Sequence, residues 1–219
     1  MMSAAEALAR LKEGNLRFVA NESRISLLDP TQRSALAAGQ EPFAIILGCS
    51  DSRVPAELVF DQGLGDLFVI RVAGNIVAPS QVGSVEFAAG MYGTKLVVVM
   101  GHTKCGAIIA TMERELGRRG QGSANLASIA DRVRPSVVSV LARGGDADPD
   151  ELIDQAVRAN VRVSVDHLRH GSTLLEEFIR KDGLVVVGAE YSLETGLVDF
   201  FDEQAVHTSP QSPGFRASK

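Results

Sequence analysis

The stretch "LVVVMGHTKCG", residues 96 to 106, decides the fold, because it joins an apolar run to a turn that carries two reactive side chains. A continuous run of branched apolar residues, without alternation, is typical of a parallel-sheet strand that is covered on both faces. Three similar runs are present: "FAIIL" at 43–47, "LFVI" at 67–70 and "LVVV" at 184–187. Together the four runs predict four buried parallel strands.

Segments with helical periodicity lie between and after these runs. They are 82–92, a helix starting near Cys105, 125–141, about 150–169, and a helix capped by Thr173 and Glu176 that stops at Gly183. "LVDFF" at 197–201 could add an edge strand. Alternating strands and helices, without an internal repeat or a linker, predict a single α/β domain in which helices flank a wound parallel sheet.

The N-terminal segment "MMSAAEALARLKEGNLRF" predicts an amphipathic helix that forms an arm before the domain. Its apolar stripe is Ala4, Leu8, Leu11, Phe18 and Val19. Charged residues interrupt the apolar run that a secretory signal would need. With only two cysteines in the chain, we expect a cytoplasmic protein whose cysteines bind metal or act in catalysis rather than form disulfides.

The composition excludes two classes of partner. Lys and Arg number 22 against 27 for Asp and Glu, a net charge of −5, which argues against a general nucleic-acid surface. No apolar stretch approaches the roughly 20 residues that are needed to cross a bilayer. We therefore expect a small-molecule substrate, with neither nucleic acid nor membrane as a partner.

Reactive side chains follow two of the predicted strands at the point where each strand ends. Cys49 comes directly after the first strand, in "GCSDSRVPAE" at 48–57, and His102 and Cys105 follow the third. Sites in open parallel sheets gather beyond the carboxyl ends of the strands. The two clusters would therefore meet if those two strands are neighbours.

Cys49, His102 and Cys105 offer two thiolates and one imidazole. Zinc favours soft sulfur and borderline nitrogen in a tetrahedral set, and a catalytic zinc keeps its fourth position for water. The alternative is that both cysteines are small buried hydrophobes. The spacing of the residues leaves both interpretations open.

Asp51 and Arg53 place a carboxylate and a guanidinium beside Cys49. Two thiolates neutralise Zn²⁺, which leaves a weaker Lewis acid. A carboxylate held by a guanidinium fork could orient the zinc-bound water and assist the loss of its proton. Alternatively, Asp51 could bind zinc as a fourth ligand and close the site, or the two residues could form an ordinary surface ion pair.

Three other cysteine or glycine motifs do not fit. A phosphatase-type loop needs five residues between cysteine and arginine, and only three separate Cys49 from Arg53. The chain has no C-x-x-C pair, and "GHTKCGAI" lacks the terminal Gly-Lys-Ser/Thr of a phosphate loop.

At these residues the sequence resembles the β-class carbonic anhydrases. The similarity covers "CSDSRVPAE" at 49–57, "FVIRVAGNIV" at 68–77, "EFAAGMYGTKLVVVMGHTKCGA" at 86–107 and, more loosely, "GLVVVGAEYSLETGLVDF" at 183–200. The resemblance implies one Zn²⁺ per subunit on Cys49, His102 and Cys105, and a catalytic pair of Asp51 and Arg53. The implied reaction is the reversible hydration of CO₂ to bicarbonate and a proton by zinc-bound hydroxide.

The resemblance also implies a central parallel four-stranded sheet with an antiparallel edge strand, in a homodimer or homotetramer. We expect an N-terminal helical arm, residues 1–40, that packs on a partner subunit. A zinc-binding catalytic domain would then span 41–206, followed by a flexible tail at 207–219.

The resemblance assigns substrate contacts to Gln40, Phe68 and Phe87. In the plant-like branch, a glutamine nine residues before the first zinc cysteine holds substrate at the dimer interface, and Gln40 has that spacing. Phe68 matches an aromatic wall of the same apolar pocket. Ala73 and Phe87 stand where plant-like members carry valine and tyrosine, so the pocket lining differs.

The bicarbonate-regulated branch has a tryptophan at the position of Ile46, with an arginine and a tyrosine that match Arg71 and Tyr191. The absence of any tryptophan argues against that regulatory pocket. Two alternative functions stay open: a zinc hydrolase on the same scaffold that acts on a CO₂ analogue such as carbon disulfide, and a non-catalytic structural-zinc protein.

Overall fold

The fold was analysed in a computed structural model, which describes residues 2–25, 31, 34, 36–120, 122–145 and 147–203. Within these residues one sheet has the strand order β2-β1-β3-β4-β5. The strands are β1 (Ala44–Gly48), β2 (Leu67–Arg71), β3 (Leu96–His102), β4 (Val185–Tyr191) and β5 (Val198–Phe200). The predicted tail at 207–219 lies outside the described residues.

The predicted sheet is confirmed in its strands and in their directions. β1 pairs in parallel with both β2 and β3, β3 pairs in parallel with β4, and β5 pairs antiparallel with β4 at the edge. Every residue of β1, β3 and β4 is buried, as their unbroken apolar sequence predicts. β1 and β3 are neighbours, so their carboxyl ends lie side by side.

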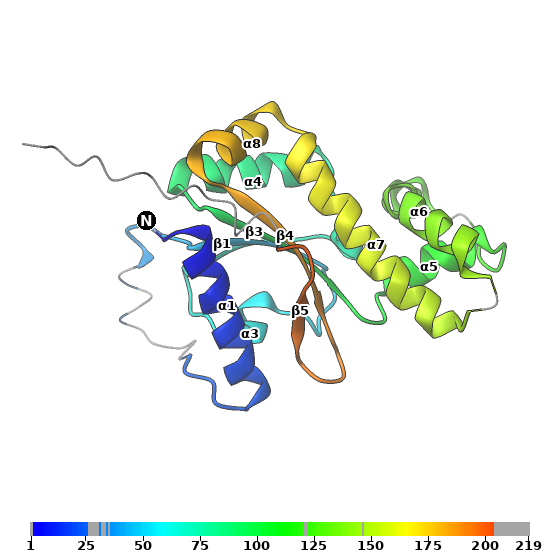
Figure 1. The fold of residues 1–219 in the computed structure, drawn as a ribbon, viewed down its shortest axis with the longest axis horizontal. Helices are drawn as coiled ribbons and strands as arrows, with labels where there is room; N and C mark the ends of the chain where they lie inside the picture. The colour runs from blue at the N-terminus through cyan, green and yellow to red at the C-terminus, as the bar shows by residue number, and fades with distance from the viewer. Residues whose placement is uncertain are drawn as a thin grey trace, which may run out of the picture.

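Helices cover both faces of the sheet (Figure 1). The helices are α1 (Ala4–Val19), α3 (Ala56–Val59), α4 (Pro79–Tyr92), α5 (Gly106–Glu115), α6 (Ala124–Gly144), α7 (Pro149–His170) and α8 (Thr173–Glu177). α1 and α3 pack on one face, and α4, α7 and α8 pack on the other. α5 and α6 form a further apolar cluster with α7 beyond the strand ends, and this cluster includes Cys49 and Cys105.

The predicted N-terminal helix is present as α1, and its apolar stripe packs on this chain's own sheet at Ala4, Leu8, Leu11 and Phe18. The prediction is wrong at Val19, which lies on the exposed side at the end of the helix. Leu8 and Leu11 are buried in the cluster that contains β1, β3 and β4. A capping box between Ser3 and Glu6 begins the helix. Leu16 and Val19 stay exposed near its end. Packing of residues 1–40 on a partner subunit stays a prediction.

The expected cap of the helix at 173–183 is wrong by one residue. Ser172 is the N-cap, because its hydroxyl accepts the Leu175 N–H at 3.2 Å, and Thr173 is already helical. The predicted end at Gly183 is confirmed: after a wide turn over Phe178–Asp182, Gly183 has φ 74°, a left-handed conformation that favours glycine.

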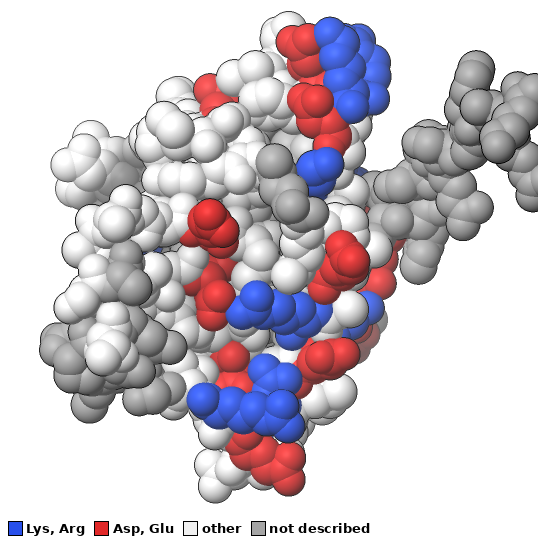
Figure 2. Space-filling view, turned by 90° about the vertical axis from the view of Figure 1, so that its left-hand side faces the viewer, with Lys and Arg blue, Asp and Glu red and all other residues white. Residues whose placement is uncertain are grey.

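Charges of both signs are interspersed on the face of the molecule shown in Figure 2 rather than gathered by sign. Among the described residues, no helix is long and apolar enough to cross a bilayer. The predicted cytoplasmic location stays a prediction.

Candidate metal centre

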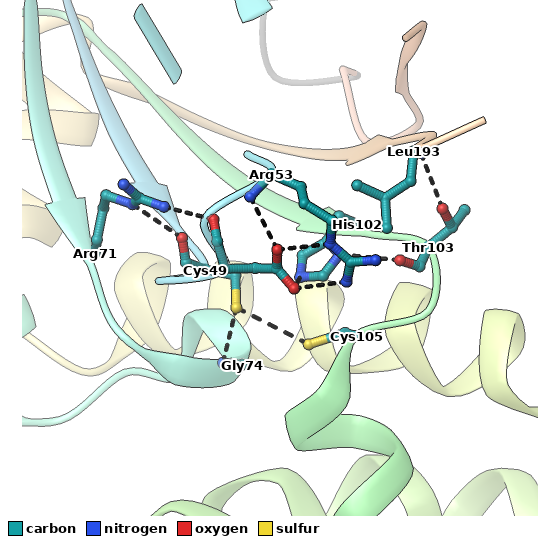
Figure 3. Close-up of polar contacts among 9 residues, drawn as sticks. Cys49, Arg53, Arg71, Gly74, His102, Thr103, Cys105 and Leu193 are labelled. Atoms are coloured by element: carbon teal, nitrogen blue, oxygen red, sulfur yellow. Dashed lines mark hydrogen bonds and ion pairs between the residues drawn. The ribbon is translucent and has the colours of Figure 1, made fainter. Parts of the chain in front are cut away.

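Cys49, His102 and Cys105 converge at the carboxyl ends of β1 and β3. Cys49 follows the last residue of β1, His102 ends β3, and Cys105 is the residue before α5. Figure 3 shows the three side chains pointing toward one another. Their ligand atoms all lie within 4.8 Å of one another, and the two sulfur atoms are 4.0 Å apart. The two clusters that the sequence predicted to meet therefore do meet.

The donor set fits a zinc ion. Two sulfurs bound tetrahedrally at about 2.3 Å from zinc are about 3.8 Å apart, close to the observed separation. His102 Nδ1 lies 2.9 Å from the Thr103 carbonyl oxygen, so Nδ1 donates to it and the neutral imidazole keeps its lone pair on Nε2. Nε2 is buried and has no hydrogen-bond partner among the described residues. A buried nitrogen of this kind is suited to binding a metal.

The loop between His102 and Cys105 is held from β4. The Leu193 N–H donates to Thr103 Oγ1 at 3.0 Å (Figure 3). The Thr103 N–H donates to the Tyr191 carbonyl, also at 3.0 Å. Lys104 has φ 56°, a left-handed conformation that turns the chain back toward the site. This turn brings the second cysteine of the H-x-x-C spacing to the same point as the imidazole.

The protonation of the two thiols is coupled. The pKa of Cys49 is lowered to about 4, because the Cys105 thiol hydrogen-bonds to the Cys49 thiolate, and the same contact raises the pKa of Cys105. Burial opposes a positive charge on His102, but contact with the Cys49 thiolate raises the His102 pKa. A divalent cation would take the place of the shared proton.

Asp51 and Arg53 form a bidentate pair beside the three ligand residues. Arg53 Nε donates to Asp51 Oδ1 at 2.9 Å, Arg53 Nη2 donates to Oδ2 at 2.7 Å, and the Arg53 N–H also donates to Oδ1. These bonds hold the pKa of Asp51 well below its usual range. Asp51 Oδ2 lies 3.9 Å from His102 Nε2. An ionised carboxylate thus faces the candidate metal position.

Arg71 fixes the backbone that carries Cys49 and Asp51, a role that the sequence did not indicate. Its guanidinium donates to the Cys49 carbonyl at 3.1 Å and to the Asp51 carbonyl at 2.6 Å (Figure 3). Arg71 pairs with Gly48 in the sheet register. The one available signal was that Arg71 ends the strand next to the Cys49 loop.

Gln40, Phe68 and Phe87 do not join the three ligand residues within one subunit. Phe68 and Phe87 form an aromatic cluster with Tyr92, with ring centroids 5.8 to 6.2 Å apart, and Gln40 donates to the Tyr92 hydroxyl at 2.9 Å. Gln40 precedes β1, whereas Cys49 follows it. A strand of five residues places its two ends about 16 Å apart. Their contact with substrate stays a prediction.

The comparisons with known proteins agree with this geometry. The sequence model of the carbonic anhydrase family matches residues 44–198. Carbonic anhydrase 2 of Mycobacterium tuberculosis is 39% identical over 85% of this chain and 87% of its own, and a carbonic anhydrase of Mycolicibacterium smegmatis is 37% identical over 86% and 89%. The structure of the β-carbonic anhydrase CafA of Aspergillus fumigatus is similar, with a TM-score of 0.72, 29% identity and coverage of 91% and 93%.

The chain belongs to the β-class carbonic anhydrases. The predicted family, fold class and enzyme class, a carbonate dehydratase, are confirmed.

Proposed function

We propose that the protein catalyses the reversible hydration of CO₂ to bicarbonate and a proton, with one Zn²⁺ held by Cys49, His102 and Cys105. The observation that carries the proposal is the set of two sulfurs and one imidazole nitrogen within 4.8 Å of one another, beside an ionised carboxylate. This nitrogen has no hydrogen-bond partner in the part of the chain that the structure describes. When bound, zinc is a Lewis acid that supplies a nucleophile from water near neutral pH.

Asp51 orients the reacting water in this proposal. Its Oδ2 faces the His102 Nε2 side of the site and accepts a hydrogen bond from water there. Because Arg53 keeps the Asp51 pKa low, the carboxylate does not retain a proton near neutral pH, and the proton passes on to buffer. Arg53 holds both oxygens in place and so fixes the direction of the hydrogen bond.

Asp51 stays off the metal in this proposal, which gives a site open to solvent. Both of its oxygens are bound to Arg53. Asp51 is also absent from the set of mutually close ligand atoms that Cys49, His102 and Cys105 form. The fourth position is therefore left for water.

A second copy of the chain would complete the substrate pocket. Gln40, Phe68 and Phe87 lie away from this subunit's own three ligand residues, and Phe87 and Met91 on α4 are 48% and 65% exposed. Exposed apolar side chains of this size are typical of a protein contact. We propose a homodimer, or a homotetramer built from it, in which these residues of one subunit line the CO₂ niche of the other.

The test combines metal analysis with stopped-flow CO₂ hydration from pH 6 to 9. We expect about one zinc per chain and rapid hydration, and the Cys49→Ala variant should lose both zinc and activity. Zinc binding without hydration would overturn the proposal. Carbon disulfide is assayed on the same preparation, and its hydrolysis in place of CO₂ hydration would assign the site to the other substrate.

A further inference from the structure

A short turn at Ala73–Asn75 supplies a hydrogen bond to the Cys49 sulfur. The Gly74 N–H donates to Cys49 Sγ at 3.4 Å (Figure 3). Gly74 has φ 68° and Asn75 has φ 43°, so two successive residues are left-handed, and only the first is a glycine. Such a backbone persists where its surroundings hold it.

The turn has little freedom to move toward α5 and α6. A Cβ atom at Gly74 would lie 3.1 Å from the Ala107 Cβ and 3.4 Å from a methyl of Val133. The Asn75 side chain does not brace the turn through its amide, because its Nδ2 is buried without a partner among the described residues. Apart from the Asn75 N–H, which donates to the Val72 carbonyl at 3.0 Å, the polar groups that hold the turn come from another element.

Two polar residues of α7 bind this turn from a distance of more than 80 positions in the sequence. Asn160 Nδ2 donates to the Gly74 carbonyl at 2.8 Å, and Ser164 Oγ donates to the Asn75 carbonyl at 3.0 Å. The two residues are one helical turn apart, and both are buried, at 1% and 4% exposure. Buried polar groups with direct partners are costly to misplace, so they fix a geometry.

α7 is itself fixed against the strand that carries His102. A Cβ atom at Gly101 would lie 2.7 Å from Val161 Cγ2, so the backbone of β3 approaches α7 closely just before the imidazole. Asn160 and Ser164 flank Val161 on the same helix. One helix thus sets the position of the Gly74 turn relative to the end of β3.

We propose that Asn160 and Ser164 are positioning residues for the metal centre, which hold Gly74 so that its N–H donates to Cys49 Sγ. The inference rests on the proposed zinc site. Two thiolates leave a metal ion with little net charge, and an N–H directed at one sulfur withdraws some of the electron density that this sulfur donates. The bond therefore raises the Lewis acidity of a site whose ligands would otherwise lower it.

The test uses the whole protein with Co²⁺ in place of zinc, because the sulfur-to-cobalt charge-transfer band reports electron donation by the thiolates. In Asn160→Leu and Ser164→Ala we expect this band to move to lower energy. We also expect the zinc forms to keep one metal per chain and to lose about 10-fold in CO₂ hydration. A merely structural role would not move the band.

Two matched controls separate positioning from packing. Ser164→Thr keeps the hydroxyl, and Ser164 lines a surface cavity, so its band and rate should match the wild type. Ser136→Ala removes a buried hydroxyl of α6 that has no partner among the described residues, and it should also leave both unchanged.

An unshifted band in both Asn160→Leu and Ser164→Ala would overturn the inference, as would an equal shift in Ser136→Ala. If Asn160→Leu does not fold, Ser164→Ala decides, because it removes one hydroxyl alone. The wild-type protein distinguishes the two levels of failure. If it gives no thiolate–cobalt band, the proposed metal site is wrong, whereas a wild-type band that the variants share refutes only the positioning role.

Discussion

Two of the aspartate–arginine pairs among the described residues differ in what they connect. Asp51 is bound by Arg53, only two residues away. Asp61 is bound by Arg17 at the end of α1, by the Ser23 hydroxyl and by the Arg24 N–H, all about 40 positions away.

The difference in reach separates a local role from a structural one. The Asp61 side chain is fully buried and joins α1 and the segment after it to the loop behind α3. The Asp51 side chain keeps 19% of its surface exposed and joins no distant elements through Arg53. We infer that Asp61, which links distant segments, stabilises the fold. Asp51 is oriented by a neighbouring residue, and it faces the candidate metal position.

The largest expected effect comes from Asp51→Asn. The amide keeps the shape but removes the charge that orients water, so we expect CO₂ hydration to fall by about 100-fold or more, with zinc still bound. The melting temperature should stay near that of the wild type. Stopped-flow assays, zinc analysis and thermal unfolding on one preparation test this, and wild-type turnover in the variant would refute the role of Asp51.

Asp61→Asn is the matched variant and should do the opposite. It removes the charged acceptor of three hydrogen bonds, one of them donated by a guanidinium, at a buried position. We expect it to lower the free energy of unfolding by about 2 kcal/mol in urea titrations. Turnover per folded, zinc-loaded chain should not change. A large loss of turnover with unaltered stability would show that the Asp61–Arg17 pair acts in catalysis rather than in stabilising the fold.

Acid pH should reduce the difference in unfolding free energy between the wild type and Asp61→Asn. Burial opposes the charge of Asp61, but hydrogen bonds from Ser23 and Arg17 lower its pKa below the ordinary value. A lowered pKa stabilises the fold at pH values above the unfolded-state pKa of about 4, and this stability is lost as pH falls through the folded-state value. Urea unfolding should show a smaller difference in unfolding free energy between the two proteins at pH 3 than at pH 7. An equal difference at both pH values would contradict an origin in the charge of Asp61.

The contrast between the two pairs also marks the limit of sequence reasoning. Four continuous apolar runs gave the strands, because burial on both faces requires such composition. The convergence of Cys49, His102 and Cys105 was predictable because each follows or ends one of two strands, and the carboxyl ends of neighbouring parallel strands lie at the same end of the sheet. The pairing of Asp51 with Arg53 was predictable because the two residues are only two positions apart in the sequence.

Contacts between residues far apart in the sequence could not be predicted in this way. Asp61 with Ser23, and Asn160 with Gly74, are polar pairs whose members look like ordinary helix or loop residues in isolation. The cap at Ser172 rather than Thr173 shows the same limit at short range, because two adjacent hydroxyl residues are equally good candidates. The structure describes a single chain and cannot show the pocket that we propose between two copies, so the substrate contact of Gln40 stays a prediction.

The smallest expected effects come from exchanging each arginine for lysine, which keeps the charge and removes the planar fork. Arg53 binds both oxygens of Asp51 through two nitrogens, so Arg53→Lys should free the carboxylate to rotate and lower CO₂ hydration by about 10-fold.

Arg17 binds Asp61 through Nε alone, and Ser23 and Arg24 still hold that carboxylate. Arg17→Lys should therefore cost only about 0.5 kcal/mol of unfolding free energy and leave turnover unchanged. Rotation of the carboxylate should affect the bound water at Asp51 and not at Asp61. Equal losses of turnover in Arg53→Lys and Arg17→Lys would therefore show that the bidentate geometry of Arg53 does not matter for catalysis.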